Sequence, residues 1–397
     1  MLLTLTILSI FLALAYAGLM LVYGQGWRAL PEWSAPPDFV PQMALTVIIP
    51  ARNEAEHIGA CLAAIVGGNY PSELLEIIVV DDHSDDATPQ IVRDAAARFP
   101  VVRLLPLADF MTANDQNGAF KKKALEVAMA RAKGEIIVTT DADCVFGADW
   151  LRLMASVFEL SEKPVQLLTA PVVFHHDQNL LQRFQTLDFL GLMGITGAGI
   201  HYKFQRMGNG ANLAYRKQIF QEMKGFAGNE NHASGDDMFL IQKVAAHYPE
   251  GIFFLKNKAA TVFTEAKPDW PSFLQQRLRW GTKNAALPEW PVRLALASVF
   301  LFCWSIIFNV LALPFAFPIK IGMSLRSIWP LPVLIFQLLV KATADYLFLG
   351  MMCRYFGRRD LLRWFWPSFF LHTLYIAGVG TASLFFKKFA WKGREVT

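Results

Sequence analysis

Long apolar runs lie at the two ends of the chain and enclose a more polar middle. The first run extends from Leu2 to Tyr23 and is long enough to cross about 30 Å of hydrocarbon. A signal peptide is the competing interpretation, because Ala15-Tyr16-Ala17 resembles a cleavage site. No basic residues precede the run and it continues past that site, so we expect an uncleaved anchor over residues 1–24.

Three further apolar runs of membrane-spanning length occur near the C-terminus, at Leu294–Phe317, Ile328–Met352 and Trp364–Phe386. They predict a membrane block over residues 291–386, followed by a basic tail over residues 387–397. The arginines between the last two runs favour a cytoplasmic loop. With four spans, the polar middle would also be cytoplasmic, although the basic residues of the tail conflict with this topology. We therefore expect an integral protein of the cell inner or plasma membrane.

One of these runs contains two charged residues, Lys341 and Asp345, which would lie one helical turn apart. Charged groups inside membrane helices are costly and are usually paired. The two residues could contact a substrate, or they could form an i,i+4 ion pair that faces other helices. We favour the ion pair.

The polar middle alternates short apolar runs with helix-like segments. Runs rich in β-branched residues predict strands over residues 45–50, 75–80, 101–105 and 135–140. Predicted helices separate them, the first opening at Asn53 with acidic residues in its first turn. This alternation predicts an α/β fold with a mostly parallel sheet, in one domain over residues 44–290 that ends in an interfacial helix.

Composition excludes several classes of protein. The chain is 54% hydrophobic with a mean hydropathy of +0.32, which is too apolar for an ordinary soluble protein. Its net charge of +4 is mild, and no basic stripe indicates a nucleic-acid partner. The four cysteines show neither zinc-ligand spacing nor a disulfide framework, which suits a reducing compartment. Because no glycine-rich phosphate loop is present, phosphates would be bound by a metal and side chains.

Polar motifs follow the predicted strands and continue toward the C-terminal block. They comprise Pro50, Glu54, Asp82, Asp141, Asp143, Asn212, Asp236, Asp237, Gln276, Arg279 and Trp280. Ligands of open α/β sheets bind at the carboxyl ends of the strands, where the first five of these residues are expected. Asp141 and Asp143 are two residues apart, so they can share a hard divalent cation that also binds phosphate oxygens.

In this order the motifs resemble those of the membrane-bound family 2 glycosyltransferases, which have a GT-A nucleotide-sugar fold. That family includes cellulose, chitin, hyaluronan and poly-N-acetylglucosamine synthases and ceramide glucosyltransferase. The resemblance implies an inverting, metal-dependent transfer of a sugar from a nucleoside-diphosphate donor, such as a UDP-sugar, to a lipid or glycan acceptor. A processive synthase that extrudes a polysaccharide is the alternative. A non-catalytic nucleotide sensor or a flippase component is a third possibility.

The resemblance also implies roles for the acids. Asp237 matches the general base, and Asp236 stands where the family has a glutamate, which leaves the choice between the two acids open. Asp143 matches the ligand of Mg²⁺ or Mn²⁺. Asp141 matches a residue that binds the ribose or the metal.

Other motif residues are implied to bind the substrates. Asp82 matches a residue that binds uracil, and Arg279 matches one that binds the pyrophosphate. Trp280 offers a flat ring for an acceptor sugar or lipid headgroup, although its segment could be only an interfacial helix. Lys123 matches a lysine near the phosphates, or it belongs to a solvated helix start. The remaining implied substrate-binding residues are Pro50, Glu54, Asn212 and Gln276.

Overall fold

The computed structural model describes residues 2–111, 120–227, 235–284, 290–316, 330–385, 389–391 and 394–396. Packing divides the chain into two units. The helical unit comprises Met1–Ala29, Asp177–Ala198 and Lys267–Lys387, and the sheet unit comprises Leu30–His176, Gly199–Ala266 and Lys388–Thr397. The segment after Lys267, which we expected to end the 44–290 domain, therefore packs with the helical unit.

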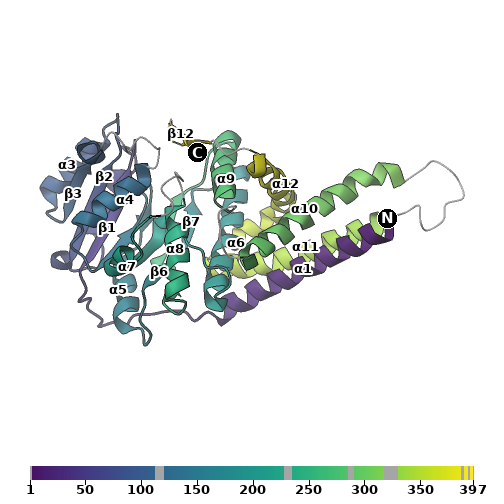
Figure 1. Ribbon diagram of the computed structural model, residues 1–397, viewed down its shortest axis with the longest axis horizontal. Helices are drawn as coiled ribbons and strands as arrows, with labels where there is room; N and C mark the ends of the chain where they lie inside the picture. The colour runs from purple at the N-terminus through teal and green to yellow at the C-terminus, as the bar shows by residue number, and fades with distance from the viewer. Residues whose placement is uncertain are drawn as a thin grey trace, which may run out of the picture. The chain divides into compact units, whose positions relative to one another are not determined.

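The sheet unit contains a seven-stranded sheet with the order β3-β2-β1-β4-β8-β6-β9 (Figure 1). Its strands are β1 (Leu45–Ala51), β2 (Leu75–Asp81), β3 (Val102–Pro106), β4 (Ile136–Thr139), β6 (Leu167–Thr169), β8 (Leu213–Arg216) and β9 (Ile252–Phe254). Strands β1 to β4 run parallel, as does the pair β6 and β9, while β8 is antiparallel to both of its neighbours. The predicted mostly parallel sheet is confirmed.

The parallel strands form the core of this unit. All seven residues of β2 are buried, and so are six of the seven in β1, as expected for apolar strands covered on both faces. Helix α4 (Phe120–Arg131) packs on β1 and β2, and α3 (Thr88–Arg98) packs on β2 and β3. Because β1 lies between β2 and β4, the strand order reverses there, and ligands of open α/β sheets bind at such a point.

A second, three-stranded sheet was not expected from the sequence. Its order is β5-β10-β7, formed by β5 (Val145–Phe146), β10 (Val262–Glu265) and β7 (Val172–His175). Further elements of the unit are α2 (Ile58–Val66), α5 (Trp150–Leu160), η3 (Gly210–Asn212), α7 (Lys217–Glu222) and α8 (Asp236–His247). In the predicted tail, β11 (Phe389–Trp391) pairs with β12 (Arg394–Val396), and the other tail residues lie outside the described ones.

The first helix of the sheet unit, α2, begins later than the sequence predicts, at Ile58 rather than Asn53. Asn53 has a positive φ of 52°. Its amide donates to the hydroxyl of Ser84 at 3.0 Å, and the amide of Glu54 donates to that of Thr88 at 2.8 Å. The positive φ of Asn53 is incompatible with a right-handed helix at this residue, and the two hydrogen bonds hold the segment in this conformation. The loops that follow β1 and β2 are thereby held together at the carboxyl edge of the sheet.

At the end of the strands that lies away from the carboxyl edge, a buried carboxylate connects β1, β2 and β3. Glu76 on β2 accepts hydrogen bonds from the hydroxyl of Thr46 on β1 at 2.8 Å and from the amide of Lys133 at 2.8 Å. Its other oxygen accepts from Arg103 on β3 at 2.7 Å. Burial would raise the pKa of Glu76, but these hydrogen bonds lower it overall. The side chain therefore stabilises the fold as a carboxylate.

The helical unit consists of long helices. They are α1 (Leu2–Ala29), the first part of α6 (Leu180–Tyr202), α9 (Trp270–Asn284), α10 (Trp290–Ala316), α11 (Leu331–Tyr355) and α12 (Phe365–Phe385), with a short η6 (Arg359–Trp364) before the last. Within the described part of the chain, four helices are long and apolar enough to cross a membrane, and they coincide with the four predicted runs.

Helix α1 packs against α10 and α11 (Figure 1). Apolar side chains from all three helices form a cluster there. Lys341 on α11 is fully buried there, and its ammonium lies 2.6 Å from Asp345. The hydroxyl of Tyr16 on α1 also donates to Asp345. The favoured interpretation of these charges, an ion pair facing other helices, is confirmed.

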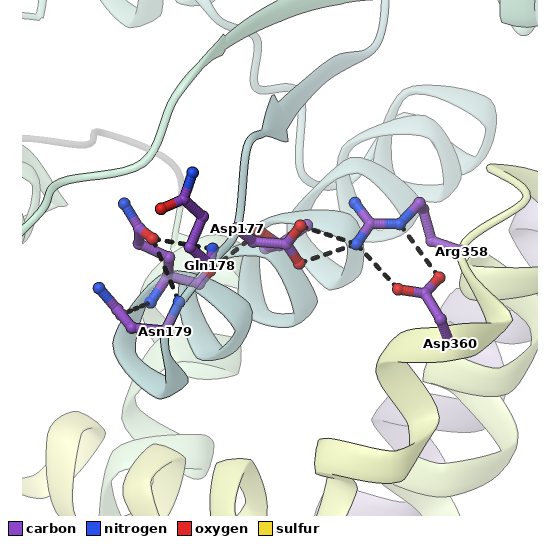
Figure 2. A network of polar contacts seen from close by, with 7 residues as sticks. Asp177, Gln178, Asn179, Arg358 and Asp360 are labelled. Atoms are coloured by element: carbon purple, nitrogen blue, oxygen red, sulfur yellow. Dashed lines mark hydrogen bonds and ion pairs between the residues drawn. The ribbon is translucent and has the colours of Figure 1, made fainter.

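A second charged contact lies at the end of α11 (Figure 2). Arg358 donates to both carboxylate oxygens of Asp177, at 2.9 and 2.8 Å, and to Asp360 at 3.1 Å. Asp177 lies just before α6, whose first turn is capped by Asn179 accepting from the amide of Gln182 at 2.9 Å. Arg358 therefore ties the start of α6 to the segment between α11 and α12.

Candidate functional site

An acidic cluster with one embedded lysine occupies the carboxyl edge of the sheet. Asp141 and Asp143 follow β4, and Lys121 lies in the first turn of α4. The ammonium of Lys121 is 2.8 Å from Asp141, and the two side chains are 24% and 40% exposed. Burial lowers the pKa of Lys121, but the carboxylates of Asp141, Asp236 and Asp237 raise it above its ordinary value. The structure thus brings together acids from two separate motifs around one cation.

Lys121 was missed in the sequence, where Lys123 was the expected phosphate ligand. The residues of a helix that lie four apart share a face. Leu125, four residues after Lys121, lines a small cavity together with Thr139 of β4. Because Lys121 and Leu125 share a face of the helix, Lys121 lies on the side of α4 that faces the acids. Lys123 lies two residues after Lys121 and therefore points about 200° away from it around the helix axis. Its contact with phosphate stays a prediction.

The two adjacent acids differ in accessibility. Asp236 is buried, with 8% exposure, whereas Asp237 is partly exposed. They begin α8 directly after Gly235, whose φ of 93° favours glycine. The amide of Gly210 donates to Asp237 at 3.1 Å, and the amide of Met238 donates to its other oxygen at 2.8 Å. Asp237 is therefore the oriented and accessible acid of the pair.

A cavity of ≈ 10 Å³ lies beside these acids. Thr139, Gly210, Asp236 and Asp237 form its polar side. The hydroxyl of Thr139 donates to the carbonyl of Gly210 at 2.8 Å, which joins β4 to the loop that carries Gly210. The space suffices for about one water molecule next to the acid pair.

Asn212, which we expected to bind substrate, forms hydrogen bonds within the protein. It is fully buried, and its amide nitrogen donates to the carbonyls of Pro171 and Ala260 at 2.7 and 2.9 Å. Its oxygen accepts from the indole of Trp150 at 2.9 Å. These bonds use both ends of the amide, so in this structure the side chain holds the loop after Gly210, and its contact with a substrate stays a prediction.

The residues expected on the nucleotide side follow β1 and β2. Pro50 is the penultimate residue of β1. Asp82 is buried, and its carboxylate lies 2.9 Å from the ring nitrogen Nδ1 of His83. Arg52 donates to the backbone carbonyls of Asp82 and His83, at 2.8 and 2.9 Å. The loop after β2 is therefore fixed by side chains of the loop after β1.

Three of the expected acids act electrostatically on the buried thiol of Cys61. Burial raises the pKa of Cys61, and the carboxylates of Asp143, Asp141 and Glu54 raise it further. The carboxylates of Asp143 and Asp141 also raise the pKa of the buried Cys144 thiol. Glu54, from the β1 loop, is thus brought to the acids that follow β4.

Asp141 and Asp143 fit a hard divalent cation as a two-carboxylate site. Among the described residues, no three or more His, Cys, Asp and Glu side chains form a metal site by themselves. Magnesium, however, is commonly bound by one or two carboxylates together with substrate phosphates and water. The chemistry of this donor pair therefore suits Mg²⁺ or Mn²⁺ when a diphosphate completes the ligands.

The remaining motif residues, Gln276, Arg279 and Trp280, lie on α9 in the helical unit. The indole of Trp280 is already stacked on the protein, because the guanidinium carbon of Arg277 lies 4.3 Å from the ring centroid. Arg277 is buried and pairs with Asp188 at 3.0 Å. Arg277 was overlooked in the sequence, where it appeared only as a variable position of the motif.

Comparisons with known proteins match this chain to glycosyltransferases. The profile described as "Glycosyl transferase family 2" matches residues 46–223, and "Glycosyl transferase family group 2" matches residues 136–377. The "Probable glycosyltransferase YdaM" of Bacillus subtilis is 27% identical over 265 residues, which are 65% of this chain and 58% of that protein. The "Beta-monoglucosyldiacylglycerol synthase" of Synechocystis is 29% identical over 33% of this chain and 27% of its own. The chain thus spans less than two thirds of the length of both relatives.

A solved structure resembles the whole chain. The mannosyltransferase PcManGT from Pyrobaculum calidifontis, in complex with GDP-Man and Mn²⁺, superposes with a TM-score of 0.60 at 22% identity. The match covers 96% of this chain and 99% of that one. Together with the strand order, this similarity confirms the predicted fold class.

Proposed function

Because the chain belongs to glycosyltransferase family 2, we propose that this enzyme transfers a sugar, with inversion, from a nucleoside-diphosphate sugar to an acceptor in the membrane. The observation that carries the proposal is the cluster at the carboxyl edge of the sheet, where Lys121 lies among Asp141, Asp236 and Asp237. One such cluster can meet both needs of the reaction, a cation for the leaving diphosphate and a carboxylate for the acceptor proton.

Asp237 acts as the general base. Its carboxylate accepts the proton of an acceptor hydroxyl while that oxygen bonds to the anomeric carbon, and the bond from this carbon to the diphosphate breaks on the opposite face. The amide of Gly210, 3.1 Å from Asp237, keeps the carboxylate oriented. Asp236 is buried, which supports Asp237 as the acid that meets the acceptor.

The donor is a UDP-sugar held at the ends of β1, β2 and β4. Asp82 binds the base, and Lys121 binds the diphosphate, as we also propose for Lys123 and Arg279. Asp143 and Asp141 would hold Mg²⁺ or Mn²⁺. Such a cation neutralises charge on the leaving diphosphate when it is bound.

A lipid is the acceptor that the helical unit favours. Four of its helices could span a membrane, and we propose that they do so with the sheet unit in the cytoplasm. Apolar side chains of α1, α10 and α11 pack together in one cluster, and this packing supports our preference for a single transfer to a lipid over extrusion of a polymer. One relative named above is called a monoglucosyldiacylglycerol synthase, and that name denotes a glycolipid product.

Membranes from cells that express the protein provide the test. They are incubated with radiolabelled UDP-glucose, UDP-galactose, UDP-N-acetylglucosamine or GDP-mannose, with Mn²⁺ or with a chelator. We expect metal-dependent label in the organic extract from one UDP-sugar, its loss in Asp237→Asn, and no change in the control Asp94→Asn, an exposed acid on α3. Label confined to insoluble polymer would favour the processive alternative. No transfer or hydrolysis of any donor would refute the enzyme.

A further inference from the structure

Helix α9 contains two arginines, of which one is buried and the other is partly exposed. Arg277 and Arg279 are two residues apart, so they face nearly opposite sides of a helix that turns about 100° per residue. Arg277 is buried with Phe273 on one face, whereas Arg279 is partly exposed. Trp280 belongs to the buried face, because it follows Phe273 by seven residues and Arg277 by three.

Aromatic rings and one carboxylate surround the buried arginine. The guanidinium carbon of Arg277 lies 4.3 Å from the ring centroid of Trp280, 5.2 Å from that of Phe273 and 5.7 Å from that of Tyr375 on α12. Asp188 on α6 pairs with it at 3.0 Å and is itself 7% exposed. A planar guanidinium can bind a carboxylate and stack on an aromatic face at once, which the ammonium of a lysine cannot do.

Asp188 has a second neighbour within the helical unit. His372 on α12 lies 4.0 Å from Asp188 through its Nε2, and its Nδ1 lies 3.4 Å from the ammonium of Lys341. A line of polar groups thus extends from α9 through α6 and α12 to α11. Because breaking a buried ion pair is costly, this line holds Arg277 in one place.

We propose that Arg277 is a positioning residue that fixes the indole plane of Trp280, and that Asp188 fixes Arg277. The functional consequence rests on the proposed function and on our further proposal that Trp280 contacts the acceptor, the role that the family resemblance implies for it. Arg277 occupies one face of the indole, so it determines how the rest of the ring is presented. Phe189 on α6, with its ring centroid 5.8 Å from that of Trp280, limits the ring from another side.

Fluorine NMR tests the contact without knowledge of the acceptor. The full-length protein is labelled with 5-fluorotryptophan in dodecyl maltoside, and Trp280→Phe identifies the resonance of that residue. We expect Arg277→Lys and Asp188→Asn each to shift this resonance. The matched control is Arg183→Lys, because Arg183 lies 4.4 Å above the ring of Trp364, and it should shift only the Trp364 signal. A Trp280 resonance unchanged by Arg277→Lys would overturn the proposal.

Sugar transfer in native membranes, which contain the endogenous acceptor, tests the consequence. A stacked, desolvated cation on an indole is worth about a 5- to 30-fold effect, so Arg277→Lys should slow transfer by about that factor while UDP affinity is unchanged. The double variant with Trp280→Phe should be no slower than Trp280→Phe alone. If Trp280→Phe itself transfers normally, the proposed role of Trp280 fails, whereas additive losses in the double variant would refute the positioning by Arg277.

Discussion

Replacing Lys121 with glutamine should weaken the binding of a nucleoside diphosphate but not that of the nucleoside. The ammonium lies 2.8 Å from Asp141. Two unit charges at that separation interact by about 1.5 kcal/mol in water and about 6 kcal/mol at an effective dielectric constant of 20. Because both side chains are partly exposed, the lower part of this range applies.

A hydrogen bond from the same ammonium to a phosphate oxygen falls in that range, at about 1.5–3 kcal/mol. Its loss predicts a decrease of about 10- to 150-fold in UDP affinity. Isothermal titration of the purified protein with UDP and with uridine, in Mn²⁺, would measure it. Uridine should bind Lys121→Gln and the natural protein equally, and Lys121→Arg should recover part of the UDP affinity.

Lys123→Gln is the matched comparison, because it removes the same charge two residues along α4. A larger loss of UDP affinity in Lys123→Gln than in Lys121→Gln would return the phosphate contact to the residue predicted from the sequence. An equal loss for uridine and UDP in Lys121→Gln would refute a phosphate contact, since it would mean that Lys121 acts through the fold.

Three further predictions concern the carboxylates of Asp237, Asp143 and Glu76. Asp237→Asn should lower turnover by about 10²–10⁴-fold with unchanged UDP affinity, and near-normal turnover would sink its assignment as the base. Asp143→Ala should remove the part of the UDP affinity that depends on Mn²⁺, so calorimetry with an unchanged metal effect would contradict it. Glu76→Gln should cost about 1–3 kcal/mol of stability at pH 7, seen as earlier thermal unfolding than in the control Glu73→Gln. Because the folded pKa of Glu76 is lowered, its contribution is fully present above the unfolded value of about 4.3 and is lost as the pH falls from there through the lower folded value, below which the two variants should converge.

The parallel half of the sheet could be predicted because each strand is a local pattern. The apolar runs with β-branched residues correspond to β1, β2, β3 and β4 within one or two residues at each end. The antiparallel β8 and the three-stranded sheet depend on pairing between distant segments, which no local pattern encodes. The late start of α2 has the same origin, because hydrogen bonds to another loop hold Asn53.

The candidate site was predictable in its residue types but not in their surroundings. Asp141 and Asp237 follow recognisable motifs, yet only the fold shows that Lys121 pairs with Asp141 and is also influenced by the charge of Asp237. Asn212 belongs to a similar motif, but burial assigns it to the protein interior. Phe273 lies four residues before Arg277 on the same helix face and could have indicated burial, but a charged side chain is rarely buried without a partner, and the partner Asp188 is distant in the sequence.

Arg358 has one role in the folded protein and, in the topology that we propose, a second one during insertion. In that topology the loop that contains Arg358 is cytoplasmic, so before α6 has packed its positive charge would favour retention of the loop on that side. Once the protein has folded, Asp177 and Asp360 compensate that charge. In the proposed topology, a charge that first orients the loop later becomes part of a tertiary contact. Arg358→Gln should therefore affect insertion as well as packing, since it would remove the orienting charge and takes the bidentate partner from Asp177.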